Sequence, residues 1–212
     1  MRLRLIYSGE LKSAGKNNRA IEKWDIRHKL HPQLEELWSV DFILQGKGPA
    51  PNRHYSPEGY IVDPPADFDG VTLERERLRK PIFVGSRPFL PLVRKSLSLT
   101  CSLDILFLRK DPPGGLVSGG GDLDNRLKVL FDGLRMPTED EMAFGKPSGE
   151  PHYCLLEDDA LIPDVSVRTD KLLSRPSAPA SEVMLVMDVI VRASAVSDDN
   201  VAFVFGIGAS TS

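Results

Sequence analysis

The chain has 212 residues, of which 41% are hydrophobic and 27% are charged, and its formal net charge is −3. These values are ordinary for a soluble globular protein with a sizeable core. The two cysteines, Cys101 and Cys154, make no disulfide framework, and no apolar run is long enough for a membrane helix. The short, charged N-terminal segment argues against a signal peptide, so we expect a cytoplasmic protein with no membrane partner.

Positive and negative charges are distributed unevenly along the chain. Residues 1–110 hold 19 of the 27 Lys and Arg but only 13 of the 30 Asp and Glu, so residues 111–212 are acidic. A basic half beside an acidic half is compatible with a metal site next to a surface that contacts phosphates. It is equally compatible with an ordinary protein surface.

The first 40 residues predict one strand followed by two helices. Basic and apolar residues alternate over residues 2–7, as in a half-buried strand. A long helical pattern then covers residues 21–38. Pro32 suits the first turn of a new helix, so we expect a break near His31.

Basic side chains gather around the start of this helical pattern, namely Lys16, Arg19, Lys23, Arg27, His28 and Lys29. A solvated helix face is the favoured interpretation. A surface that contacts the DNA backbone is the alternative, because Lys and Arg can position a duplex without reading its sequence.

The middle of the chain predicts a loop followed by the clearest strand. Residues 46–70 are rich in Gly, Pro and Asp, which favours an extended loop. Residues 82–84 predict a short strand. Over residues 97–108 apolar side chains alternate with Ser, Thr and Asp, which is the pattern of a strand with one buried face.

The second half adds further strands, at residues 161–169, 183–192 and 201–205, and an inserted loop at residues 136–153. We therefore expect an α+β fold with a mixed or antiparallel sheet and packed helices. The predicted organisation is a single domain over residues 1–212, with a core at about 97–192. Residues 1–96 would be an N-terminal strand–helix elaboration, and residues 193–212 a C-terminal tail.

One candidate site stretch begins where a glycine-rich run gives way to a helical pattern. Asp122 and Asp124 stand at this boundary, and either can cap the helix that follows. If residues 122–124 are still extended, both carboxylates point to the same side. Lys128 and Asp132 then lie one and two turns beyond Asp124, and Asp132 would be the i+4 partner of Lys128. A capped amphipathic surface helix is the plain alternative.

A second acidic stretch, Glu157-Asp158-Asp159, leads into the strand predicted at residues 161–169. Adjacent like charges repel unless something neutralises them. A hard cation such as Mg²⁺, which takes carboxylate oxygens and keeps several waters, is the obvious candidate.

Taken together, the two stretches resemble the RusA-type Holliday junction resolvases, which are metal-dependent endonucleases that cut four-way DNA junctions. The similarity covers about residues 97–192 and rests on the following motifs: Asp122-Leu123-Asp124-Asn125, Lys128, Phe131-Asp132-Gly133-Leu134, Asp158-Asp159-Ala160 and Asp164.

The resemblance implies a role for each matching residue. Asp122, Asp124 and Asp159 would bind Mg²⁺, for which Mn²⁺ could substitute, and Asp158 is a further candidate ligand. Lys128 would assist cutting by neutralising charge on the phosphate or by positioning the attacking water. The resemblance also implies a RusA-like fold, a branched-DNA substrate in recombination or repair, and a homodimer.

Two other classes of function stay open from the residues alone. The chain could be a non-catalytic nucleic-acid-binding accessory protein that retains the fold. Alternatively, the acids could be helix caps and strand-entry charges of a structural or interaction protein.

Overall fold

The computed structural model describes residues 1–12, 19–41, 44–45, 54–55, 61–62, 78–110, 122–173, 177, 179–196, 200 and 203; of 54–55, 61–62 and Asp122 it describes the backbone alone. Over these residues the chain is an α+β protein with two α-helices and two mixed sheets. Of the predicted strand at 201–205 only residue 203 is described, and most of the predicted loop at 46–70 lies outside the described residues.

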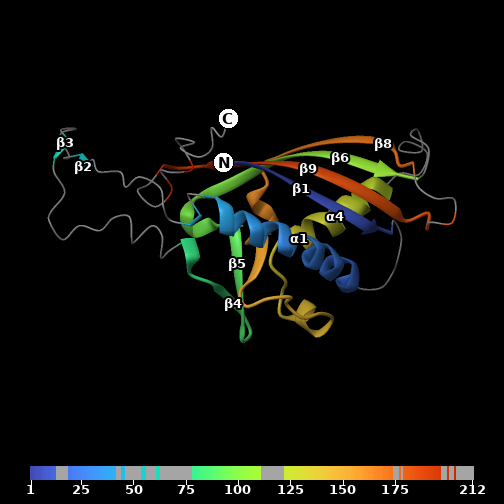
Figure 1. Ribbon diagram of the computed structural model, residues 1–212, viewed down its shortest axis with the longest axis horizontal. Coiled ribbons are helices and arrows are strands. Elements are labelled where there is room, and N and C mark those ends of the chain that lie inside the picture. Colours follow the sequence, from blue (N-terminus) through green and yellow to red (C-terminus); the bar gives the residue numbers. More distant parts are fainter. Residues whose placement is uncertain are drawn as a thin grey trace.

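The main sheet has four strands in the order β1-β9-β6-β8 (Figure 1). Their bounds are β1 Arg2–Glu10, β6 Leu99–Arg109, β8 Asp164–Lys171 and β9 Glu182–Ala193. β9 is antiparallel to both β1 and β6, whereas β8 is parallel to β6. The strands predicted at 2–7, 97–108 and 183–192 are thereby confirmed, and the one predicted at 161–169 begins three residues later.

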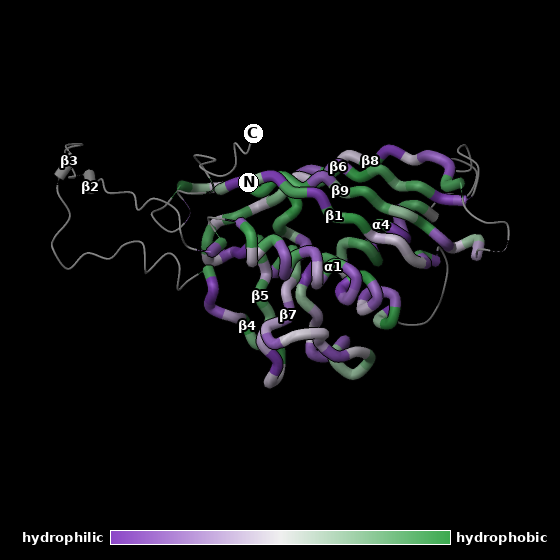
Figure 2. The backbone as a smooth tube through the Cα atoms, viewed as in Figure 1, coloured by the Kyte–Doolittle hydropathy of each residue, from purple (hydrophilic) through white to green (hydrophobic). Residues whose placement is uncertain are grey.

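Two helices, α1 (Ala20–Val40) and α4 (Asp122–Leu134), lie on one side of this sheet and pack against each other (Figure 1). Alternate residues of β6, including Leu103 and Ile105, are buried in the same core as Leu30 and Leu34 of α1. Full burial of one such side chain contributes about 1.5–3 kcal/mol. Figure 2 shows long hydrophobic stretches in β6 and β9, the central strands of the main sheet, and a mostly hydrophilic β8 at its edge.

Residues 1–41, expected to be an elaboration, contribute to the central core. β1 pairs with β9 over its whole length, and α1 contacts β1, α4 and β7 (His152–Leu156). The N-terminal strand and helix therefore share one hydrophobic core with residues 97–192.

The predicted break near His31 is wrong, because α1 is a single helix with Pro32 inside it. Proline lacks the N–H that would bond one turn back, which ordinarily ends or kinks a helix. Here Pro32 is exposed, while buried residues before and after it, Leu30 and Leu34, both join the core. Packing on both sides of the proline therefore outweighs one missing hydrogen bond.

A second sheet has the order β4-β5-β7, with β4 Ile82–Val84 as predicted and β5 Arg87–Val93. β5 is antiparallel to β4 and parallel to β7. The sequence interpretation missed β5, which contains two prolines, and placed the start of β7 in a loop. Proline is tolerated in β5 because its two neighbours overlap only at Phe89, so most of the strand has a single partner.

Short elements complete the described chain. They are the paired strands β2 (His54–Tyr55) and β3 (Ile61–Val62), and the 3₁₀ helices η1 (Lys95–Leu97), η2 (Asp140–Ala143) and η3 (Asp159–Leu161). None of the helices in the described part of the chain is long and apolar enough to cross a membrane.

Candidate functional site

The first acidic stretch belongs to α4, which begins at Asp122. Residues 122–124 are therefore helical and not extended, so the two carboxylates do not point to the same side, because positions i and i+2 of a helix do not share a face. Asp124 lies in the first turn with its side chain 66% exposed, and its Oδ2 is 2.8 Å from Nζ of Lys128. Asp124 is thus accessible to a ligand, and Lys128 is held beside it.

Two members of the second acidic stretch, Glu157 and Asp158, form hydrogen bonds with Lys95 of η1. Lys95 donates from its backbone N–H to Oε2 of Glu157 over 2.9 Å, and from Nζ to Oδ2 of Asp158 over 2.7 Å. Asp158 also caps η3, because its Oδ1 accepts from the backbone N–H of Ala160 over 2.9 Å. The hydrogen bonds from Lys95 and from Ala160 lower the pKa of Asp158 to about 2.

Asp159, the first residue of η3, is the exposed member of this acidic stretch. It interacts with the neighbouring carboxyl of Asp158, which already has Lys95 and a backbone N–H as partners. The geometry therefore divides the stretch: Glu157 and Asp158 hold the local structure, and Asp159 faces solvent.

The elements that carry the two acidic segments are in contact, because α4 contacts both η3 and β7. The end of α4 that lies beside β7 is its C-terminal end, where Arg135 forms a bridge with Leu156, whereas Asp124 is in the first turn. Among the described side chains, however, no three or more His, Cys, Asp and Glu are grouped closely enough to hold a metal ion. The side chain of Asp122 lies outside that description. Asp124 and Asp159 are hard oxygen donors that suit Mg²⁺, which commonly takes one or two carboxylates and keeps several waters.

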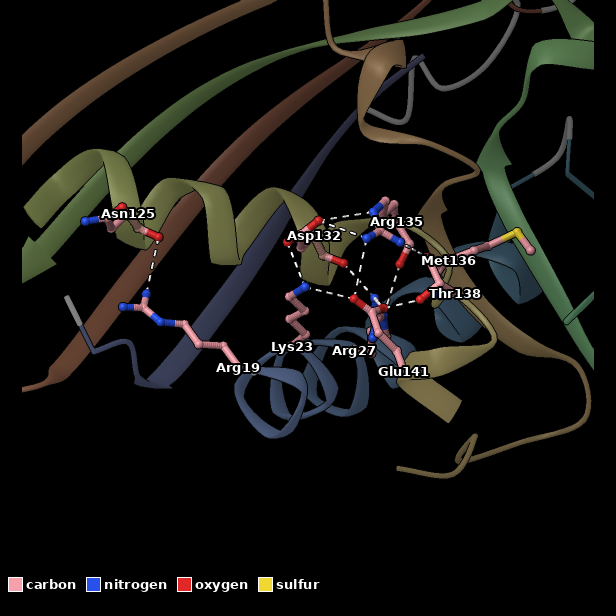
Figure 3. A network of polar contacts seen from close by, with 9 residues as sticks. All are labelled: Arg19, Lys23, Arg27, Asn125, Asp132, Arg135, Met136, Thr138 and Glu141. Atoms are coloured by element: carbon pink, nitrogen blue, oxygen red, sulfur yellow. Dashed lines mark hydrogen bonds and ion pairs between the residues drawn. The ribbon is translucent and has the colours of Figure 1, made fainter. Parts of the chain in front are cut away.

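Asp132 has partners other than the expected Lys128. Its carboxylate binds Nζ of Lys23 at 2.8 Å and Nη2 of Arg135 at 2.9 Å (Figure 3). Lys128 pairs with Asp124 instead. Asp132 therefore belongs to a polar network between α1 and α4, two helical turns from Asp124.

The centre of this network is Glu141 of η2, which the sequence interpretation did not single out. Lys23 donates to its Oε1 and Arg27 to its Oε2, over 2.8 and 2.7 Å, and Arg135 approaches Oε1 at 3.4 Å (Figure 3). Burial acts to raise the pKa of Glu141, but the hydrogen bond from Lys23 and the charges of Arg27 and Arg135 outweigh it and lower the pKa.

The predicted solvated helix face is accordingly wrong for two of its basic residues. The side chain of Arg27 is only 1% exposed, and burial lowers its pKa despite the adjacent Glu141. Lys23 is largely enclosed by Asp132 and Glu141. Lys29 fits the prediction, since it forms an exposed pair with Asp25, and Lys16 lies outside the described residues.

A histidine cluster between α1 and β7 also went unrecognised. The rings of His31 and His152 stack with centroids 4.4 Å apart, and the ring of Trp24 meets His152 edge-on at 6.1 Å. His152 is fully buried and accepts at Nδ1 from the backbone N–H of Ser148. Burial, followed by the nearby His31, His28 and Arg27, lowers the pKa of His152 to about 3.

Neither cluster had a local sequence signal. His31 and His152, like Arg27 and Glu141, are more than a hundred positions apart, and no motif or spacing links them.

Comparisons of the chain with protein-family models, with curated proteins and with solved structures found no match. The features that define it are therefore an α+β fold and exposed aspartates on two contacting elements.

Proposed function

We propose that this chain is a Mg²⁺-dependent endonuclease that acts on branched DNA, with a RusA-like fold. The observation that supports the proposal is the packing of α4, which carries Asp124 in its first turn, against η3, which starts at Asp159. Both aspartates are exposed. They occupy the positions that match the metal-binding acids in the resemblance to the resolvases.

Asp124 and Asp159 would hold the metal, together with Asp122 at the start of the same helix. When bound, Mg²⁺ supplies charge stabilisation at the scissile phosphate and a water with a lowered pKa. Asp158 acts differently in this account: it caps η3 and binds Lys95, and so fixes the backbone from which Asp159 projects.

Lys128 supplies the cation of the proposed site. It lies one helical turn from Asp124 and is itself exposed, with 2.8 Å between its Nζ and the carboxylate. From this position its ammonium group can reach a phosphate that approaches Asp124, and oppose the negative charge that develops there.

A second candidate is a nucleic-acid-binding accessory protein that retains the fold without cutting. The two candidates differ in whether phosphodiester hydrolysis accompanies binding.

Cleavage of an end-labelled synthetic four-way junction would test the proposal, with a linear duplex of matched sequence as the control substrate. The reaction is run with Mg²⁺, with Mn²⁺ and with chelator. We expect metal-dependent, symmetric nicking of the junction and little cutting of the duplex. Cutting of both substrates would support a nuclease that is not selective for branched DNA. Binding of the junction without cutting would favour the accessory protein.

A further inference from the structure

The two edges of the main sheet differ in how they are protected. At the β1 edge, Gln33 of α1 accepts from the backbone N–H of Ile6 over 2.9 Å and donates to the carbonyl of the same residue over 2.7 Å. The side-chain amide thus occupies the backbone groups that another strand would use. This edge is blocked at its centre.

The opposite edge is β8, which no other strand of the described chain covers. All of its residues are exposed or half-buried, and β6 is its only partner strand in the described sheet. Beyond this pairing, the described contacts of the β8 backbone include one local hydrogen bond, from Lys171 N–H to the side chain of Asp170. An edge strand of this length with unpaired backbone groups is a ready template for another strand.

The apolar face of the sheet also continues onto β8. Val165 and Val167 are in register with Leu103 and Ile105 of β6, which are buried in the core. Register partners in adjacent strands share a face, yet Val165 is 37% exposed. A strand added beyond β8 would therefore extend both the hydrogen-bonding ladder and the apolar layer.

The sequence of β8 is complementary to itself in the antiparallel register centred on Ser166. With Ser166 at the centre, Asp164 lies opposite Arg168 and Val165 opposite Val167, and the two-fold axis repeats each pair. Arg168 already approaches Asp104 of its own chain at 3.2 Å, and a guanidinium has donors for a second carboxylate. Cross-strand pairs of these kinds are stabilising.

The registers centred on the next two residues, Val167 and Arg168, have like-charged pairs. Centring on Val167 places Asp164 opposite Asp170, and centring on Arg168 places two arginines opposite each other. Like charges directly opposite in a sheet are destabilising. The register centred on Val165 has no opposite-charge pair within β8, and the one centred on Thr169 pairs Arg168 with Asp170 but places Val167 opposite Lys171. Only the register centred on Ser166 combines an opposite-charge pair with an apolar pair, so charge and apolar pattern together favour it.

We propose that β8 pairs antiparallel with β8 of a second copy of this chain, centred on Ser166, to form one continuous sheet. This inference specifies the interface of the homodimer that the proposed function implies. It rests on the proposed function only because that function leads us to expect a dimer. Because η3 immediately precedes β8, the two copies of Asp159 would lie toward opposite ends of the paired strands.

Cysteine cross-linking tests both the surface and its register. In the proposed pairing Ser166 faces its own counterpart, so Ser166→Cys should give a disulfide-linked dimer under mild oxidation. Asp170→Cys is the matched control on the same strand and face, since its two copies would be separated by about 26 Å along the strands. Cys101 and Cys154 are buried and should not contribute.

Sedimentation equilibrium of the full chain gives the independent readout. The unmodified chain should be dimeric, and Asp164→Arg, which places arginine opposite Arg168, should weaken the dimer by about ten-fold or more. A monomer, equal cross-linking at both positions, or a dimer that neither cross-links through Ser166→Cys nor responds to Asp164→Arg would overturn the interface. These readouts measure association alone, so they do not depend on whether the chain cuts DNA.

Discussion

Arg27 of α1 donates from Nη2 to Oε2 of Glu141 over 2.7 Å, with side-chain exposures of 1% and 6%. The same arginine donates to the carbonyls of Asp132 and Arg135, near the C-terminal end of α4. One buried cation thus ties three segments together, and Glu141 is its counter-charge.

Glu141→Gln should be strongly destabilising. The amide keeps the shape but leaves Arg27 without its buried carboxylate, and breaking one side of a buried ion pair typically costs about 3–5 kcal/mol. Urea unfolding measures the loss. Glu139→Gln, on an exposed neighbour in the same segment, is the control and should change stability by less than about 0.5 kcal/mol. Equal effects of the two substitutions would contradict a central role for Glu141.

Gly133→Ala should also destabilise the fold, although alanine has the higher helix propensity. A Cβ at Gly133 of α4 would lie 2.7 Å from the side chain of Ile26 in α1, which is itself buried. Overpacking of this kind costs about 1–3 kcal/mol, against a propensity gain of about 1 kcal/mol. Asn125→Ala, at an exposed position of the same helix, should be neutral or slightly stabilising. A thermal melt in which Gly133→Ala is the more stable variant would show that the helices do not approach as closely as described.

The buried His152 predicts that stability falls on mild acidification. Its pKa is about 3 in the fold, against about 6.5 in the unfolded chain, so the unfolded state binds more protons between these values. The contribution of His152 to the free energy of unfolding is complete above pH 6.5. It is lost as the pH falls toward 3, by about 1.4 kcal/mol per pH unit.

Unfolding free energies at pH 6.5 and pH 5 would measure this dependence, with His152→Gln as the comparison. Most carboxylates stay ionised over that range. The variant is expected to be less stable overall but to show a flatter pH profile, because the titrating group is gone. An unchanged slope would mean that other groups control the acid response.

The different roles of Asp158 and Asp159 can be tested by measurements of unfolding free energy alone. Asp158→Ala removes the η3 cap and the partner of Lys95, and should cost about 1 kcal/mol. Asp159→Ala, at an exposed carboxylate, should leave the unfolding free energy within about 0.5 kcal/mol. If instead Asp159→Ala were the more destabilising, Asp159 would have a structural role and would be less available to a ligand.

The sequence predicts secondary structure correctly where a local residue pattern reflects which face of the element is buried. The alternation of residues 97–108 predicts β6, because one face of that strand is buried and the other is not. It failed for β5, where two prolines hide a strand that has one partner along most of its length. It also failed at Pro32, where burial of Leu30 and Leu34 maintains the helix through the proline.

For the site, the sequence could locate acids but could not assign their partners. Lys95 lies more than sixty residues before Asp158, and no spacing rule connects them, yet this contact separates Asp158 from Asp159 in role. Likewise, Lys23 and Arg27 look like surface charges until the fold brings Glu141 against them. Such pairings depend on tertiary packing, which local patterns do not encode.

The measurement that tests the central claim most directly is the cleavage rate of a four-way junction by the unmodified chain, by Asp159→Asn and by Asp124→Asn, in Mg²⁺ and in Mn²⁺. We predict that the unmodified chain cuts. Each variant should lose activity by at least about 100-fold while it stays folded and still binds the junction, because only the proposed metal ligands are altered. No cutting by the unmodified chain, or variants that cut at the unmodified rate, would contradict the account.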